Sequence, residues 1–441
     1  MTVIEGNNMA KPMKSRLARV ALAAVASLAP VVAQAGIYPE CPPGAVQLGP
    51  NAAGNGLEES SAARVCGHLT AGDGWMQLPS GERSYIFGFA IADPDPANVM
   101  VRGIFNAKFP APTLVFRERQ EVFLSLSNVG MAHRPDLFDP HSIHFHGYPQ
   151  ASAVYDGVPE ASVTVNMGSS FTYFYKLNDP GTYVYHCHVE ATEHMQMGMT
   201  GNLYVRPRQD GTAFSFPAAP LTGAQADVLG PLVPRTTSRF AYNDGDGSSG
   251  YDVEAALQLS SFDQGFHLLH EAVQPLPFEG LRSTHTFING RGYPDTLNQA
   301  TTTFDPPVPD DSAPLPESSQ PNPSLVVVPR GQRLLLRLTN LSVVDYFTVT
   351  ALGLDFRVVG AGASATRTDP ARLPGGLPGV VTKDWSHRTN SVTLGGGESI
   401  DVIVDTDRVP AGTYTFFTTN LQYLSNGSED RGGIMTHIVV Q

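Results

Sequence analysis

Short runs in which apolar and polar residues alternate recur along most of this chain. In the run 121–127, Val122, Leu124 and Leu126 fall on one face, which is typical of a strand with one buried side. Turn-bounded runs of the same kind predict further strands at 111–116, 171–176, 182–185 and 202–206. No amphipathic helical period extends over a long stretch, although 253–266 fits either a helix or a strand. The pattern predicts an all-β chain.

The second half of the chain repeats the outline of the first. Strands are predicted there at 325–328, 333–338 and 399–404, and Gly412-Thr-Tyr-Thr-Phe-Phe417 matches Gly181-Thr-Tyr-Val-Tyr-His186. Internal similarity of this kind predicts two copies of one Greek-key β-sandwich. We predict an irregular lead-in at residues 36–80 and a first domain at 81–207. A Pro/Gly/Ser-rich linker at 208–250 then leads to a second domain at 251–441.

Composition and charge narrow the classes of function. The 441 residues are enough for two or three domains, and 41% hydrophobic content supports packed cores. Only 16% of residues are charged, and the formal net charge is −13. Because no run of Lys and Arg interrupts this acidic excess, we do not expect a nucleic-acid partner.

The N-terminus has the pattern of an export signal. Lys14, Arg16 and Arg19 precede an apolar stretch at 20–32, and two small residues follow at positions 33 and 35. We therefore predict a signal peptide over residues 1–35, cleaved before Gly36, and a periplasmic or secreted protein. The apolar stretch is too short to span a bilayer, and no later stretch is apolar enough.

The three cysteines fit an exported protein. In an oxidising compartment Cys41 and Cys66 could form a disulfide, and Cys187 would then be left alone. An unpaired cysteine between two histidines needs another explanation, and ligation of a metal supplies one.

Two short motifs hold most of the candidate chemistry: His141-Ser-Ile-His144-Phe-His146-Gly147 and His186-Cys187-His188. Successive side chains of a strand point to opposite faces. His186 and His188 therefore share one face, and Cys187 points away from both of them. This alternation predicts a thiolate site and a histidine cluster on opposite sides of one strand.

The thiolate side has the ligand set of a blue (type 1) copper site. Two imidazoles and a cysteinate with a weak axial thioether describe such a site. The predicted ligands are His141, Cys187, His194 and Met199. The alternative is a buried cysteine with unrelated core histidines, which would require this order of residues to arise by chance.

The opposite side would hold four imidazoles and no thiolate. Such a set suits copper of type 2 or type 3, or zinc. The residues are His144, His146, His186 and His188. The alternative is that these histidines only support the neighbouring site or have lost their metal.

With these residues the chain resembles the multicopper oxidase family of cupredoxin proteins. The resemblance covers roughly residues 80–441 and is most specific at the copper motifs. It is carried by His144-Phe-His146-Gly147, by Tyr155-Asp-Gly-Val-Pro159, by the His-Cys-His motif with His194 and Met199, and by Phe287-Ile-Asn-Gly-Arg291 with Tyr293-Pro-Asp-Thr296.

The resemblance implies two cupredoxin-like domains, copper cofactors and an electron relay. A phenolic or metal-ion donor, such as Cu(I), Fe(II) or Mn(II), would deliver electrons singly to the type 1 copper. They would then pass through Cys187 to a histidine copper cluster where dioxygen is reduced. By motif position, His144 would hold type 2 copper, and His146, His186 and His188 a type 3 pair. Asp156 would assist proton delivery.

The thiolate motif departs from the family pattern in one spacing. The interval from Cys187 to His194 is two residues longer than is common in laccases, whereas that from His194 to Met199 is the expected one. Met195 and Met197 lie nearby and could compete for the axial position.

The second domain departs further from the pattern. A trinuclear site needs eight histidines, and the first domain supplies four. Alignment of the two domains places Phe347, Thr350 and Leu352 opposite the first histidine motif, and Phe417-Thr-Thr419 opposite the second. The second domain therefore has no copper ligands at the equivalent positions.

Three ways of completing the cluster remain open. Another subunit could contribute histidines, as in related trimeric two-domain oxidases and copper nitrite reductases, so we predict an oligomer. The candidates are His267, His270, His285 and His437. Two first domains could instead face each other, or the cluster could hold only one or two coppers.

The leading interpretation is an exported, copper-dependent oxidoreductase of the laccase-like kind. One alternative is an enzyme similar to copper nitrite reductase. Another is an electron-transfer or copper-binding protein with a working type 1 site and a degenerate cluster, which the missing ligands of the second domain favour.

Overall fold

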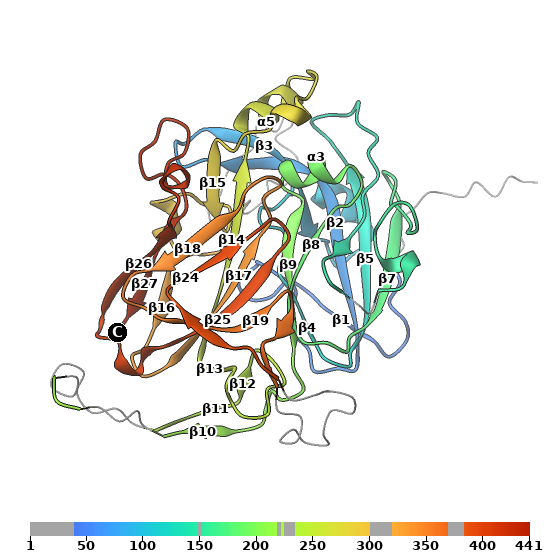
Figure 1. Ribbon diagram of the computed structural model, residues 1–441. Coiled ribbons are helices and arrows are strands. Elements are labelled where there is room, and N and C mark those ends of the chain that lie inside the picture. The colour runs from blue at the N-terminus through green and yellow to red at the C-terminus, as the bar shows by residue number, and fades with distance from the viewer. Residues whose placement is uncertain (1–38, 149–150, 218–221, 225–233, 300–319, 369–382) are drawn as a thin grey trace, which may run out of the picture. The chain divides into compact units, whose positions relative to one another are not determined.

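The computed structural model describes residues 39–148, 151–217, 222–224, 234–299, 320–368 and 383–441. The predicted signal peptide, residues 1–35, lies outside this range. Strands dominate, as predicted, and the few helices are short (Figure 1). In the described part of the chain, no helix combines the length and apolar character that crossing a bilayer requires.

The first sandwich packs a five-stranded sheet against a four-stranded one, and aromatic and aliphatic side chains such as Leu124 and Tyr185 fill the space between them. The larger sheet runs β1 (Val46–Gln47), β2 (Arg64–Gln77), β5 (Glu121–Gly130) and β7 (Ser170–Lys176), with β3 (Arg83–Ile91) paired to β2. The smaller sheet runs β4 (Leu114–Arg117), β9 (Thr200–Arg206), β8 (Gly181–His186) and β6 (His144–Phe145).

The second sandwich has its own core, centred on residues such as Leu336 and Phe416. One sheet runs β15 (His285–Ile288), β14 (Val253–Phe262), β17 (Arg333–Asn340), β25 (Ser399–Asp405), β19 (Phe356–Ala361) and β20 (Ser364–Ala365), with β23 (His387–Thr389) on β19. The other runs β16 (Val326–Val328), β27 (Met435–Val440), β26 (Gly412–Thr418), β18 (Phe347–Ala351) and β24 (Ser391–Leu394).

The two sandwiches share one pattern of strand pairing, which confirms the repeat inferred from the sequence. β2 runs parallel to β5 and β5 antiparallel to β7, just as β14 runs parallel to β17 and β17 antiparallel to β25. The register confirms the alignment of the motifs as well. His144 lies opposite His186 in the first domain, and Thr350 lies opposite Phe417 in the second.

The predicted irregular lead-in at 36–80 is wrong over its second half, because β2 is a long strand in the middle of the larger sheet. All its residues from Val65 to Met76 are buried, so both faces are covered and the sequence shows no alternation. A Cβ at Gly67 would come within 2.6 Å of a methyl group of Leu57, so a larger residue there would displace that side chain. The Cys41–Cys66 disulfide ties the preceding segment to this strand.

One further segment differs from its predicted structure, and in another the structure resolves the choice between helix and strand. The predicted linker is not a bare connection in its described part. It forms the short strands β10 (Phe214–Phe216), β11 (Arg235–Thr237), β12 (Arg239–Phe240) and β13 (Gly250–Tyr251). The ambiguous segment 253–266 divides into strand β14 and the start of helix α5 (Gln264–Glu271), which begins at the capping side chain of Asp263.

Among the described residues, the remaining short elements are helices α2 (Val99–Gly103) and α3 (Ala191–Gln196), strands β21 (Arg367–Thr368) and β22 (Lys383–Asp384), and five 3₁₀ turns. These turns are η1 (Ala153–Tyr155), η2 (Phe278–Gly280), η3 (Asp295–Leu297), η5 (Thr406–Arg408) and η6 (Leu421–Leu424). Helix α5 packs on β3 of the first domain, close to α3 (Figure 1).

A buried ion-pair network joins the two sandwiches behind β8. Arg337 is fully buried, donates to Thr182 Oγ1 at 2.7 Å and pairs with Glu254. Thr182 in turn donates to Asp401 at 2.7 Å. The pKa of Glu254 is lowered although burial alone would raise it, because Arg337 and Arg206 both pair with its carboxylate. This network holds the strand that ends in His186 against the second domain.

We predict that Arg337→Met destabilises the fold strongly. The substitution removes one cation from a buried pair and leaves Glu254 and Asp401 less well compensated, which costs about 3–5 kcal/mol of unfolding free energy. Chemical denaturation measures this loss. Arg388→Met is the control, because its side chain is 57% exposed and its surface ion pairs contribute about 1 kcal/mol or less. Equal losses of unfolding free energy in the two variants would contradict the stabilising role of the buried network.

Candidate metal centre

The four residues of the predicted thiolate site lie at the ends of three strands and in one short helix. His141 precedes β6 and bridges to Val165, while Cys187 directly follows the last residue of β8. His194 lies in α3, and Met199 precedes β9. The smaller sheet therefore holds the cysteine between a loop histidine and a short helix.

The nitrogen and sulfur donors of this site converge. Cys187 Sγ lies 3.2 Å from His194 Nδ1 and 3.7 Å from His141 Nδ1, and the two imidazole rings are 4.9 Å apart. All three side chains are fully buried, and Cys187 is a free thiol. The backbone N–H of Ser142 points to the sulfur at 3.5 Å. A buried thiol facing two imidazole nitrogens matches the trigonal donor set of blue copper.

Met199 lies beside this triad. The backbone N–H of Cys187 donates to the Met199 carbonyl at 3.2 Å, and the Met199 side chain is fully buried in the same core. Met197 is equally buried, whereas Met195 is partly exposed. Met199 stays the predicted axial ligand, and burial alone argues only against Met195.

The electrostatics of the triad favour a cation beside the sulfur. Burial lowers the pKa of His141 well below its usual range. Burial would lower the pKa of His194 too, but the neighbouring Cys187 and Asp139 raise it to about 10. Positive charge is thus stabilised at the His194 ring, next to the sulfur.

The four histidines of the predicted cluster lie together on the opposite side of Cys187. The ring of His144 lies 5.6 Å from that of His146, 5.4 Å from that of His186 and 4.9 Å from that of His188. His186 is buried, and the other three are partly exposed. The strand alternation inferred from the sequence therefore accounts for the arrangement.

Backbone carbonyls orient three of these rings. His144 Nδ1 donates to the Asp156 carbonyl at 2.7 Å, His146 Nδ1 to the Gly397 carbonyl at 3.1 Å and His186 Nδ1 to the Cys187 carbonyl at 2.7 Å. A histidine that donates through Nδ1 leaves Nε2 free as a metal ligand. Each of these bonds therefore prepares one ligand atom.

The free nitrogens face one another. The ligand atoms of His144, His146 and His186 lie within 4.8 Å of each other, and Nε2 of His146 is 2.8 Å from Nε2 of His186. With both Nδ1 atoms donating to carbonyls, two lone pairs would meet at this distance unless a proton or a metal ion lies between them. The three imidazole donors are of the kind that copper and zinc accept.

Asp156 lies at the rim of this cluster. Its side-chain oxygen is 3.7 Å from His144 Nδ1, and the side chain is 35% exposed. This position lies between solvent and a cluster histidine, as a proton-delivery group requires. The role itself stays a prediction.

The histidines of the second domain that were candidates for completing the cluster lie elsewhere. His267 is buried between the carbonyls of Tyr85 and Gln196, at 2.6 and 2.9 Å. His270 contacts Glu193 through Nε2 at 2.8 Å and Arg134 through Nδ1. Because both rings are packed inside their own chain, the idea that they serve a neighbouring subunit is wrong. His285, the first residue of β15, is buried next to Thr284. His437, on β27, lies near Tyr293.

The second domain contributes something that the sequence did not reveal. Gly397, in the turn between β24 and β25, supplies the carbonyl that orients His146. A Cβ at this position would come within 2.4 Å of the His146 ring, so only glycine fits. A glycine carbonyl has no side-chain signature, and only the fold brings it to the cluster.

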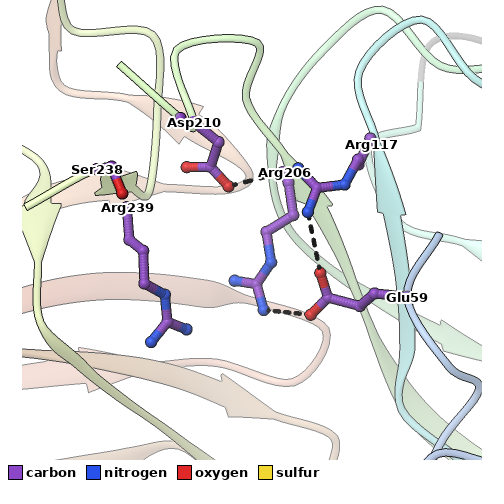
Figure 2. Close-up of a pocket in the computed structure, with 7 residues that line it drawn as sticks. Glu59, Arg117, Arg206, Asp210, Ser238 and Arg239 are labelled. Carbon is purple, nitrogen blue, oxygen red and sulfur yellow. Dashed lines mark hydrogen bonds and ion pairs between the residues drawn. The ribbon is translucent and has the colours of Figure 1, made fainter. Parts of the chain in front are cut away.

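A separate polar pocket is lined by Glu59, Arg117, Arg206, Asp210 and Arg239, together with Gly211 and Ser238 (Figure 2). Arg206 pairs with Glu59 at 3.0 Å, and Arg117 lies 3.6 Å from Glu59 and 3.9 Å from Asp210. The carboxylates largely neutralise the arginines, so the pocket lacks the excess charge of an anion site.

Comparison with known proteins agrees with this centre. Two family models, both described as multicopper oxidase, match residues 94–210 and 266–441. The chain therefore belongs to the multicopper oxidase family, whose members are copper-dependent oxidoreductases with type 1, 2 and 3 copper.

Curated relatives match over limited regions. Laccase abr2 of Aspergillus fumigatus is 31% identical over 165 residues, which is 36% of this chain and 25% of that protein. Multicopper oxidase MCE of Talaromyces pinophilus is 34% identical over 107 residues, or 24% of this chain and 16% of that protein. The matched region is thus a quarter or less of each relative.

Solved structures support the fold. Blue copper oxidase from Nitrosomonas europaea superposes with a TM-score of 0.56 at 21% identity and covers 87% of this chain and 86% of that one. Multicopper oxidase mgLAC gives a TM-score of 0.56 at 19% identity, with 86% and 87% coverage. The two sandwiches are therefore cupredoxin-like, as predicted.

We predict that Cys187→Ser removes the blue charge-transfer absorption of the copper-loaded protein and lowers its copper content by one ion per chain. The thiolate is the source of that absorption, and the four cluster histidines remain. Absorption spectroscopy with metal analysis measures both changes. His387→Gln is the matched control, since this histidine is exposed on β23 of the second domain, and it should keep colour and copper. An unchanged colour in Cys187→Ser would rule out the type 1 site.

Proposed function

We propose that this chain is an exported multicopper oxidase that couples one-electron oxidation of a phenolic or metal-ion donor to reduction of dioxygen. One observation carries the proposal. Cys187 faces two buried imidazoles on one side of its strand, while its neighbours His186 and His188 point into a histidine cluster on the other. A single peptide segment thus connects two candidate copper sites.

Copper held at these sites would supply one-electron redox chemistry and the capacity to activate dioxygen. The protein's own part is to hold the donors in a fixed, water-free geometry. His141, Cys187 and His194 are fully buried, so the thiolate site cannot reorganise by taking up water. Rigid donors of this kind keep the structural change on electron transfer small.

The path from the thiolate to the cluster is short and hydrogen-bonded. Cys187 and His186 share a peptide bond, and His186 Nδ1 also donates to the Cys187 carbonyl at 2.7 Å. Electrons would therefore have a covalent and a hydrogen-bonded route to the same imidazole. Asp156, next to His144 and partly exposed, would bring protons to the oxygen-reducing side.

The Cys41–Cys66 disulfide supports export, because disulfides persist in oxidising compartments. A cleaved signal peptide over residues 1–35 and a periplasmic or secreted location are part of the proposal.

Association of several copies, such as a trimer, is also part of the proposal. Three of the four cluster histidines are partly exposed, and the described second domain places no histidine beside them. A neighbouring molecule could therefore contact this face and complete the cluster. The histidines of α5 are not available for that purpose.

A carrier function is the second candidate, and the second domain favours it. Thr350 and Phe417 occupy the positions that correspond to His144 and His186. A chain with four cluster histidines could bind too little copper to reduce dioxygen and would then act as a type 1 electron carrier or a copper-binding protein.

We predict that the copper-loaded protein consumes dioxygen with a phenolic donor and that His146→Gln lowers this rate by about 100-fold while retaining the blue absorption. Loss of one cluster ligand weakens the oxygen site and leaves the thiolate site intact. An oxygen electrode and paramagnetic resonance measure the two sites separately, with His387→Gln, at an exposed position on β23, as control. Blue wild-type protein that consumes no oxygen would favour the carrier, and nitrite turnover in its place would favour a nitrite reductase.

A further inference from the structure

His267, on helix α5 of the second domain, lies between two backbone carbonyls of the first domain. Its ring is fully buried, with Nε2 2.9 Å from the carbonyl oxygen of Gln196 and Nδ1 2.6 Å from that of Tyr85. A neutral imidazole donates from one nitrogen, and a protonated one donates from both. The ring therefore ties the end of α3 to α5, beside β3.

The Gln196 carbonyl lies at the start of the turn that leads to the predicted axial ligand. Gln196 is the last residue of α3, two residues after His194 and three before Met199. The backbone N–H of Met199 donates to the His194 carbonyl at 2.9 Å, which closes the turn on itself. A displacement of the Gln196 carbonyl would therefore change the spacing of these two predicted ligands.

Strand β3 holds the same turn at its next residue. The backbone N–H of Phe87 donates to the Met197 carbonyl at 2.9 Å, and the Phe87 ring meets the ring of His194 edge-on at 5.7 Å. Gly198 has a φ of +116°, and a Cβ there would come within 2.9 Å of the Phe87 carbonyl oxygen. The turn therefore lies directly against β3, and the bond from His267 is a second point of attachment.

Helix α5 leaves the His267 ring little freedom. The ring lies 4.4 Å from that of Phe262, and its Nδ1 is also 3.2 Å from Ser84 Oγ. One turn further along α5, His270 contacts Glu193 of α3 at 2.8 Å. The contact from His267 is made to the backbone, so it fixes the course of the chain whatever side chain stands at position 196.

We propose that His267 is a positioning residue for the thiolate site. Its bond to the Gln196 carbonyl sets where Met199 stands relative to the other predicted ligands. Because the axial ligand tunes the reduction potential of a blue copper site, the second domain would thereby tune a site that lies in the first. The inference rests on the proposed function, in which type 1 copper occupies this site.

Three substitutions in the copper-loaded full chain separate the two carbonyl contacts. His267→Phe keeps a ring and removes both donors. The amide nitrogen of glutamine can take the place of Nε2, and that of asparagine the place of Nδ1. His267→Gln therefore keeps a donor for Gln196, and His267→Asn keeps a donor for Tyr85. Redox titration of the blue absorption and paramagnetic resonance of the copper measure the effect on the site.

We expect His267→Phe and His267→Asn to change the ratio of reduced to oxidised copper at a fixed ambient potential about tenfold, a shift of ~59 mV for one electron. The copper hyperfine splitting should change with it, whereas His267→Gln should stay close to the wild type in both measurements. His68→Phe is the matched control. His68 is also buried, but it lies on β2 and contacts Ser127 at 2.7 Å, so its loss should leave the potential unchanged.

The outcomes separate this inference from the proposed function. If His267→Phe keeps the potential and the resonance spectrum of the wild type, or if all three variants change them equally, the inference is overturned, even where a phenolic donor still drives oxygen uptake. A lower thermal midpoint with an unchanged spectrum overturns it too, because His267 would then support only the fold. If the potential shifts as expected but no donor drives oxygen uptake, the positioning role stands and the oxidase proposal fails. Should His267→Phe not fold, the comparison of His267→Gln with His267→Asn decides.

Discussion

The alternation of side chains along one strand is the constraint on which this structure depends. Residue 187 follows the last residue of β8, so its sulfur points into the core between His141 and His194, while His186 and His188 point to the other side. No flexible segment separates the two groups of donors. Any shift of register by one residue would exchange the faces and destroy both groups at once.

The rest of the fold can be understood as support for that strand. The smaller sheet fixes its register through the pairing of His144 with His186, and the network of Arg337, Glu254 and Asp401 packs behind it. The second domain has Thr350 and Phe417 in place of donors at the equivalent positions, but it orients His146 through the Gly397 carbonyl. Its α5 also packs against the α3 segment that carries His194. The second domain therefore shapes both groups of donors in the first, although its described residues place no such donors at the equivalent positions.

Much of this could be predicted from sequence because its signals are local. The fold class follows from period-two alternation, and the convergence of His141, Cys187 and His194 follows from motif spacing. β2 was missed because a strand buried on both faces, with glycines where neighbours press close, lacks that alternation. The contact of Gly397 with His146 was missed because a backbone atom of a segment distant in sequence makes it. The packing of His267 and His270 against the first domain could not be predicted, because their spacing in the sequence does not show which surface their helix contacts.

Diffraction data collected at the copper absorption edge from copper-loaded crystals test the central claim most directly. The account predicts one anomalous peak bounded by the side chains of Cys187, His141 and His194, and further copper density among His144, His146, His186 and His188. Copper bound only at sites remote from residue 187, with its sulfur unligated, would contradict it.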